Sequence, residues 1–160
     1  AFVDPSSDAR GHFGEDVLLG WAARRAGARP AFCAGAVVRH AVFPRGPRGF
    51  VAERSRLAYF PELARRVPEL RASMFRARFF LTRRTALFDL ALAALALAAV
   101  QRRPPAALAA LPYARVLLGE ARGRARDRSA ALVAAADLAA DLAGFAALVR
   151  GSTAARSPVL

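Results

Sequence analysis

Residues 14–27 read GEDVLLGWAARRAG, a stretch with the start signal, the apolar face and the stop signal of an amphipathic helix. Two acids open the stretch, two arginines close it, and Gly27 follows as a candidate C-terminal cap. Its apolar residues recur at helical spacing. They are Val17, Leu18, Trp21 and Ala22. We therefore predict a helix from about Glu15 to Ala26.

The residues after this helix predict two short strands. Pro30 precedes the apolar run 31–33, and a second extended run, partly β-branched, covers 36–42. We therefore expect an α/β fragment, in which a helix and short strands are followed by a mostly α-helical, apolar tail. Cys33 is the only cysteine, so a disulfide within the chain and a cysteine-based zinc site are excluded. We expect its thiol to be buried and structural.

The pair Glu15-Asp16 and the later His40 are the candidate site residues of this part of the chain. Carboxylates in a first helical turn are stabilised as anions by free backbone N–H groups and the helix dipole, which suits a general base or a metal partner. Taken alone, the pair has a second explanation, because acids are common in any first helical turn. His40 is either a metal ligand or an unliganded histidine at a strand end.

With its flanks, this pattern resembles the C-terminal part of the catalytic domain of family 2 glycosyltransferases, which have the GT-A fold. The resemblance covers residues 1 to about 60 and rests on 14–27 and on the apolar segment that ends at His40. It implies an inverting transfer of a sugar from a nucleotide-sugar donor to a hydroxyl of a glycan or lipid-linked acceptor. Asp16, next to Glu15, is then the catalytic base, and His40 helps to bind a divalent metal, Mg or Mn.

The same resemblance implies a diphosphate-binding role for two arginines. Processive members carry Gln-Arg-x-Arg-Trp, and residues 53–57 of this chain read ERSRL. Arg54 and Arg56 match the two arginines, and their paired N–H donors suit a diphosphate. A solvated arginine face is the alternative. The missing tryptophan implies a single transfer, and Leu18 and Ala22 replace an acid and an arginine of many members, which leaves the choice of sugar and acceptor open.

Members of the family bind the nucleotide with an N-terminal βαβ half and hold the metal with an Asp-x-Asp pair. Neither lies in this chain, which begins at Ala1 in the middle of the pattern. We therefore expect a fragment of the transferase that is inactive alone.

The remainder of the chain is rich in alanine and arginine. The formal net charge is +13 and the chain has no lysine, so its surface attracts phosphates of any source. Residues 85–100 and 106–118 are apolar, with QRRPP between them. Each run is shorter than the roughly 20 residues of a membrane span. Two arrangements of these runs remain as alternatives. One is a hairpin that enters one leaflet of a membrane, and the other is a pair of helices packed on protein.

We predict a last helix from Ser129 to about Arg150, ended by Gly151, with Asp137 and Asp141 on a polar face. Its apolar face covers either a membrane surface or a protein core. The expected segments are 1–57 (C-terminal portion of a GT-A domain), 58–84 (Arg-rich helical connector), 85–119 (two short apolar helices), 120–151 (charged connector and amphipathic helix) and 152–160 (flexible tail).

Two functions follow as hypotheses. The first is part of a membrane-associated glycosyltransferase on the cytoplasmic face of the cell membrane, peripheral or shallowly inserted. The second is a non-enzymatic, Arg-rich helical module that binds a membrane surface or nucleic acid. The second leaves the Glu15-Asp16 helix without a purpose, and nucleic acid is not the favoured partner.

Overall fold

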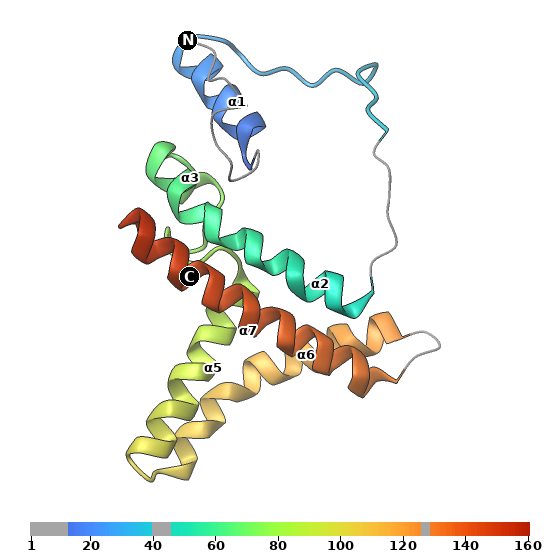
Figure 1. Ribbon diagram of the computed structural model, residues 1–160, viewed down its shortest axis with the longest axis vertical. Coiled ribbons are helices and arrows are strands. Elements are labelled where there is room, and N and C mark those ends of the chain that lie inside the picture. Colours follow the sequence, from blue (N-terminus) through green and yellow to red (C-terminus); the bar gives the residue numbers. More distant parts are fainter. Residues whose placement is uncertain (1–12, 40–45, 126–128) are drawn as a thin grey trace. The chain divides into compact units, whose positions relative to one another are not determined.

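A computed structural model of the chain describes residues 13–39, 46–125 and 129–160. Within these ranges the chain is helical and forms no sheet, and its β-bridging is limited to the pair Arg76 and Phe80. The elements are α1 (Glu15–Arg25), α2 (Pro47–Glu53), the 3₁₀-helix η2 (Arg54–Tyr59), α3 (Phe60–Arg66), α4 (Leu70–Ser73), α5 (Arg83–Val100), the 3₁₀-helix η3 (Pro104–Ala110), α6 (Leu111–Ala125) and α7 (Ala130–Ala155) (Figure 1).

The chain divides into two compact units, Ala1–Pro44 and Arg45–Leu160. Helix α1 belongs to the first, and α2 to α7 belong to the second. Residues 46–57, expected to belong with the first segment, thus lie in the second unit, where α2 and η2 pack against α7.

Helix α1 confirms the predicted helix and both of its end signals. It begins at Glu15 and ends within one residue of the expected position. Gly27 has a φ of 93°, its N–H donates to the Arg24 carbonyl oxygen at 2.9 Å, and the Ala28 N–H donates to the Ala23 carbonyl oxygen at 2.9 Å. These two hydrogen bonds are those of a Schellman motif, which glycine favours at this position.

The predicted α/β fold class is wrong for the described residues. The expected strand 31–33 and residues 36–39 of the expected strand 36–42 have no strand structure, while 40–42 lie outside the described ranges. Short strands are stable only when neighbouring strands take their hydrogen bonds and an apolar layer covers one face. Among its described residues, the first unit offers these segments a single helix and no second strand.

The side chains of this segment are accordingly exposed. Phe32 is 94% exposed, and Val37 and Val38 are 75% and 74% exposed. Cys33 is also exposed, contrary to the expected buried thiol. These apolar, partly β-branched side chains are therefore not packed against other described residues of the unit.

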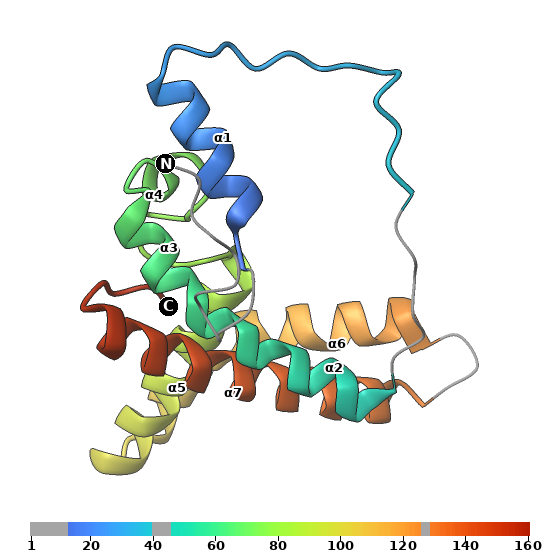
Figure 2. The same ribbon diagram turned by 45° about the horizontal axis from the view of Figure 1, so that its top comes forward.

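Helix α7 is the centre of the second unit. It contacts α2, η2 and α3, and it also contacts α5 and α6 (Figures 1 and 2). Its buried residues are mostly small, which lets neighbouring backbones approach closely. They are Ala134, Asp137, Ala140, Gly144, Ala147, Leu148 and Gly151.

Gly151 does not end α7 as predicted, because the helix continues to Ala155. A Cβ at Gly151 would lie 2.1 Å from the Ala58 carbonyl oxygen of η2, and a Cβ at Gly144 would lie 3.0 Å from Leu57 Cδ1. The two glycines, one heptad apart on α7, thus serve the close packing of η2.

The two apolar runs expected at 85–119 form a helical hairpin of α5 with η3 and α6. Phe88 and Ala91 of α5 and Tyr113 of α6 make its buried core. The Phe88 ring packs edge-on against the Tyr113 ring, with 5.2 Å between the centroids. Of the two alternatives left open by the sequence, packing on protein is thus present along the inner faces of these helices.

The ends of α5 are capped in different ways. At the start, Thr82 and Thr85 form a capping box, with hydrogen bonds of 3.1 Å to the Thr82 hydroxyl and 3.0 Å to the Thr85 hydroxyl. At the end, Arg102 has a φ of 51°, and the Arg103 N–H donates to the Ala98 carbonyl oxygen at 3.1 Å. Glycine is the usual residue at this left-handed position, and a side chain there costs about 1 kcal/mol.

Residues 156–160 are packed, in contrast to the flexible tail expected at 152–160. Val159 has no exposed surface, and its N–H donates to the Ser152 hydroxyl at 3.0 Å. The Leu160 N–H donates to the Phe79 carbonyl oxygen at 3.1 Å, and the Leu81 N–H donates to the Leu160 carbonyl oxygen at 2.6 Å. These bonds join the last residues to the segment that precedes α5.

The close approach of α7 and η2 predicts a large effect of one methyl group. We expect Gly151→Ala to lower the free energy of unfolding by about 2 kcal/mol or more, because the new Cβ overlaps backbone that cannot rotate away. Gly123→Ala on α6 is the matched control, since nothing lies within 4 Å of its added Cβ. That variant should be neutral or stabilising by up to about 1 kcal/mol. Urea unfolding measures both, and equal effects would contradict the packing.

Candidate functional site

The acid pair lies in the exposed first turn of α1. Gly14 precedes the helix in a left-handed conformation with a φ of 77°, and its carbonyl oxygen accepts the Leu18 N–H at 2.9 Å. The Glu15 and Asp16 side chains are both exposed. Because no side chain caps this end, the first-turn N–H groups and the two carboxylates share one surface, which suits contact with a polar ligand.

The half-buried face of α1 is its apolar one. Val17, Leu18 and Trp21 are partly covered, while the rest of the helix from Ala22 to Arg25 is exposed. The Arg24 guanidinium lies over the Trp21 ring, 5.2 Å from its centroid. The helix therefore presents its acids and its last-turn arginines on the outside.

His40 lies outside the described residues, so its meeting with Asp16 and its role as a metal ligand stay predictions. Within the described ranges, no three or more His, Cys, Asp and Glu side chains gather into a group able to hold a metal ion. The described residues thus do not make a metal centre by themselves.

Arg54 and Arg56 both lie on η2, in the second unit, but in different surroundings. Arg54 is half-buried and its guanidinium lies over the Phe50 ring, 5.0 Å from the centroid. Arg56 is exposed. Two residues apart on a 3₁₀-helix, they point to different sides. The two arginines therefore do not form one fork for a diphosphate in this unit.

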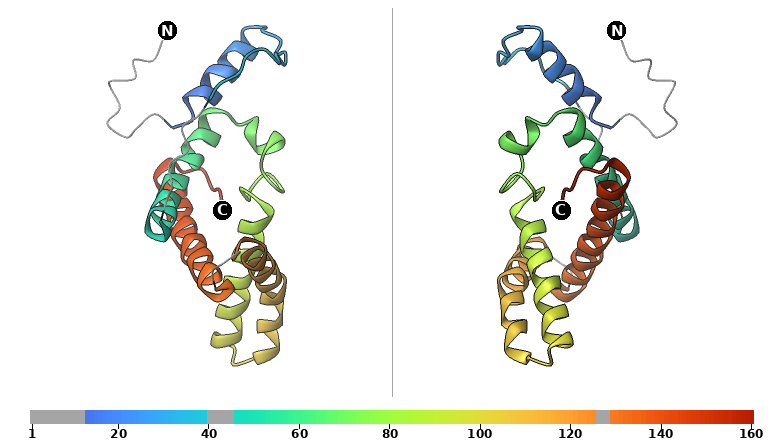
Figure 3. Two further views of the ribbon diagram at one scale, coloured as in Figure 1. Left: turned by 90° about the vertical axis from the view of Figure 1, so that its right-hand side faces the viewer. Right: turned by 90° about the vertical axis from the view of Figure 1, so that its left-hand side faces the viewer.

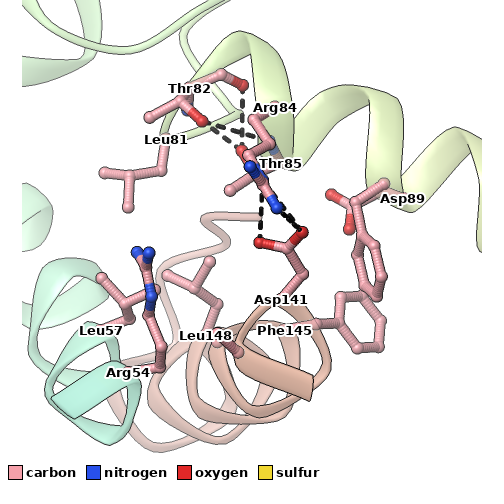
Figure 4. A pocket seen from close by; sticks show the side chains of 13 residues that line it. Arg54, Leu57, Leu81, Thr82, Arg84, Thr85, Asp89, Asp141, Phe145 and Leu148 are labelled. Carbon is pink, nitrogen blue, oxygen red and sulfur yellow. Dashed lines mark hydrogen bonds and ion pairs between the residues drawn. The ribbon is translucent and has the colours of Figure 1, made fainter. Parts of the chain in front are cut away.

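Arg54 lines a cavity of about 70 Å³ between η2, the start of α5 and α7 (Figure 4). Leu57 and Leu148 lie beside Arg54, while Arg84 and Asp141 close the opposite side. The cavity is lined by Arg54, Leu57, Leu81, Thr82, Arg84, Thr85, Phe88, Asp89, Ala140, Asp141, Gly144, Phe145 and Leu148. Its volume suits a few water molecules, whereas small-molecule sites measure about 300 Å³ or more.

Asp141 is the centre of a polar cluster that joins three helices. Arg84 of α5 donates to it from Nη2 at 2.7 Å and from Nε at 2.9 Å, both to Oδ2, and the Tyr113 hydroxyl of α6 donates to Oδ2 at 2.8 Å. Arg84 also pairs with Glu120 of α6. The Asp141 side chain is only 13% exposed, so these bonds replace most of its hydration.

The surroundings of this cluster raise the pKa values of both Arg84 and Tyr113. Burial lowers the pKa of Arg84, but the hydrogen bonds and charge of Asp141 outweigh it, so the net pKa lies above the ordinary value. Burial raises the pKa of the Tyr113 phenol, and the Asp141 carboxylate raises it further. These shifts favour the charged form of Arg84 and the neutral form of the Tyr113 phenol.

Asp137, one turn before Asp141, makes the second buried ion pair. Its side chain is 3% exposed and it pairs with Arg124 of α6. The predicted polar face of α7 is thus an interior face, while Leu138, Leu142 and Val149 are 39%, 47% and 40% exposed. The spacing of the two aspartates indicated that they share one face of α7, but it did not indicate whether that face is buried or exposed.

Asp89 is a lone acid on the apolar helix α5. Its Oδ2 atom is buried at the cavity wall and has no hydrogen-bond partner among the described residues. Burial raises the pKa of the Asp89 carboxyl to about 6.

Helix α7 is the described helix that is long and apolar enough to cross a membrane by length and composition. Of its most apolar 18-residue window, 33% is buried within the second unit, and Asp137 and Asp141 lie in the same helix. The core helix of a soluble protein passes the same test, so this property alone does not assign a span.

The sequence matches no protein-family model, and the searches of curated proteins and of solved structures give no significant match. The proposed function below therefore depends on the sequence pattern and the geometry of this chain.

The Asp141 cluster predicts an asymmetry between two substitutions. We expect Asp141→Ala to lower the free energy of unfolding by about 3 kcal/mol, because the half-buried Arg84 loses its buried partner and keeps the pair with the more exposed Glu120. Tyr113→Phe should cost only about 1 kcal/mol, the value of one hydrogen bond. Glu62→Gln, which weakens the two surface ion pairs of Glu62 with Arg65 and Arg66 on α3, is the control and should cost about 1 kcal/mol or less. An Asp141 variant as mild as the control would contradict the role of the cluster.

Asp89 predicts a pH-dependent stability. Its ordinary pKa of 3.8 rises to about 6 in the folded chain, so between these values the folded state keeps a proton that the unfolded chain has lost. Stability therefore falls as pH rises through this window. Asp89→Asn should match the parent chain near pH 4 and exceed it by about 1 kcal/mol at pH 7, after allowance for partial solvation. Urea unfolding at both pH values checks this, and a pH-independent difference would contradict it.

Proposed function

We propose that this chain is the C-terminal portion of an inverting, metal-dependent glycosyltransferase that resembles family 2. It transfers a sugar from a nucleotide-sugar donor to a hydroxyl of a cell-envelope glycan or a lipid-linked acceptor. We place this activity at the cytoplasmic face of the membrane.

The observation that carries the proposal is the first turn of α1. Glu15 and Asp16 are adjacent, exposed and next to the first-turn backbone N–H groups. A carboxylate in this position is accessible to an acceptor hydroxyl and can take its proton. Two exposed acids at a helix start are also found where they contribute to solubility alone. The glycosyltransferase proposal therefore depends on the flanking pattern of residues 14–27 as well as on the acids.

The apolar surface of the first unit supports a larger catalytic body. Phe32, Val37 and Val38 follow α1 and are each more than two-thirds exposed. An extended segment of this composition becomes stable when it adds to the edge of a sheet. A GT-A domain supplies such a sheet, and the same partner would cover the half-buried face of α1.

The chemical step follows from the role of Asp16. Its carboxylate takes the proton of the acceptor hydroxyl while the hydroxyl oxygen forms a bond to the anomeric carbon. The bond between that carbon and the nucleoside diphosphate breaks from the opposite face, and the diphosphate leaves with the electron pair. One displacement of this kind inverts the anomeric centre. Glu15 borders the same surface and completes the acid pair.

The proposal assigns the leaving diphosphate to arginine. Arg56 is the exposed candidate, and Arg54 is the half-buried one at the cavity of the second unit. A divalent metal, Mg or Mn, supplies charge neutralisation when bound, and His40 is its expected ligand from this chain.

The proposal predicts that the complete transferase depends on one oxygen of Asp16. We expect Asp16→Asn to lower kcat by about 10² to 10⁴-fold, because the amide cannot accept the proton, while the donor dissociation constant stays within about threefold. Release of nucleoside diphosphate measures turnover, and isothermal titration measures donor binding.

Glu62→Gln is the control for this experiment, because it makes a carboxylate-to-amide change at a partly exposed residue of α3 in the second unit. Its turnover should equal that of the parent enzyme. Normal turnover of the Asp16 variant would remove Asp16 from catalysis. Loss of donor binding and turnover together would assign Asp16 to binding instead.

A further inference from the structure

We propose that the end of the α5–η3 hairpin docks on an anionic lipid bilayer. The docking surface consists of Leu97, Val100, Arg102, Arg103 and Leu108 and is called the hairpin end below. This inference rests on the second unit alone, so it stands or falls independently of the role of Asp16.

The hairpin end exposes large apolar side chains. Val100 is 82% exposed, Leu108 is 63% exposed and Leu97 is 46% exposed. Deeper in the hairpin, Phe88 and Ala91 are 3% and 4% exposed and face Tyr113. The hairpin therefore buries an inner face and leaves apolar side chains exposed on its outer faces and at its end, where Val100 is the most exposed.

The arrangement of the second unit makes this end accessible to a surface. The turn that joins α5 to η3 lies away from α7, α2 and η2 in each of the views (Figures 1 and 3). A protruding apolar end meets a flat bilayer without rearrangement of the rest of the unit.

The charge of the hairpin selects an anionic partner. Residues 90–119 contain Arg102, Arg103 and Arg115 and no acidic residue. Both Arg102 and Arg103 are exposed and stand between the apolar side chains of α5 and those of η3. Juxtaposed leucine and arginine side chains are typical of segments that lie at the headgroup and acyl boundary, where the long arginine stems reach the phosphates.

Arg102 keeps a positive charge at the turn that ends α5. It has a φ of 51°, as Arg156 has a φ of 49° at the end of α7, and glycine fits this conformation with less strain. Replacement of Arg102 by glycine therefore removes the charge without disturbing the turn.

A lipid bilayer fits this surface better than a second copy of the chain. Two copies joined through their hairpin ends would bring four arginines together in a contact without carboxylates. Anionic headgroups neutralise the same charges.

The test measures binding of the whole chain to vesicles by sedimentation, with phosphatidylcholine alone or mixed with phosphatidylglycerol. We expect binding to the mixed vesicles and at least about tenfold weaker binding to phosphatidylcholine alone. Val100→Ser/Leu108→Ser should weaken binding to the mixed vesicles by about tenfold or more, because both side chains lose their burial in the bilayer.

Leu132→Ser is the matched control, because Leu132 is also 63% exposed but lies on α7. Its binding should stay within about twofold of the parent chain. Arg102→Gly/Arg103→Gln should weaken binding by about tenfold or more while thermal stability is unchanged or increased. Far-UV circular dichroism and thermal melts of each variant verify the fold.

Several outcomes would overturn the proposal. One is binding that Leu132→Ser weakens as much as Val100→Ser/Leu108→Ser does, and another is equal binding to both kinds of vesicle. Absence of vesicle binding, with self-association that depends on Leu108, would assign the surface to a second copy. Binding to duplex DNA in place of vesicles, weakened by Arg102→Gly/Arg103→Gln but not by Val100→Ser/Leu108→Ser, would assign the surface to nucleic acid.

Discussion

The second unit depends on two aspartates that α7 carries into its interior. Asp141 holds Arg84 of α5 and Tyr113 of α6, and Asp137 holds Arg124 of α6. A buried carboxylate needs a partner in a fixed place, so these pairs define how the three helices register along one another. Apolar contacts among alanine and leucine side chains are less specific about register. Because the two aspartates occupy the inner face of α7, several leucines of this helix are exposed.

Local features of the fold were predictable from the sequence, and contacts between distant segments were not. The helix from Glu15 and its glycine cap at Gly27 follow from residues within one turn of each end. The strands predicted at 31–33 and 36–42 required a neighbouring sheet, and no local pattern supplies one. Gly151 looked like a stop signal, but the backbone of Ala58, ninety-three positions earlier, determines its role.

The candidate site divides along the same line. The exposed acid pair at the start of α1 follows from position in the helix, and it lies where the sequence predicts. Arg54 and Arg56 were grouped by sequence spacing, yet the 3₁₀ geometry of η2 separates their surroundings. The cluster around Asp141 joins residues from three helices, and only the spacing of Asp137 and Asp141 hinted at it. The tertiary structure determines which arginine pairs with Asp141, and nothing in the sequence distinguishes Arg84 from the other arginines.

The buried position of Val159 affects how the second unit folds during its synthesis on the ribosome. The last residues hydrogen-bond the segment before α5, and Val159 joins the core cluster with Ala64, Phe75 and Leu148. Those bonds form only after residue 160 has left the exit tunnel, long after α5 has been synthesised. Until then the apolar helices of this unit are held together incompletely. Nascent chains of this protein therefore expose their arginine-flanked leucines to the cell until residues 156–160 have emerged from the ribosome.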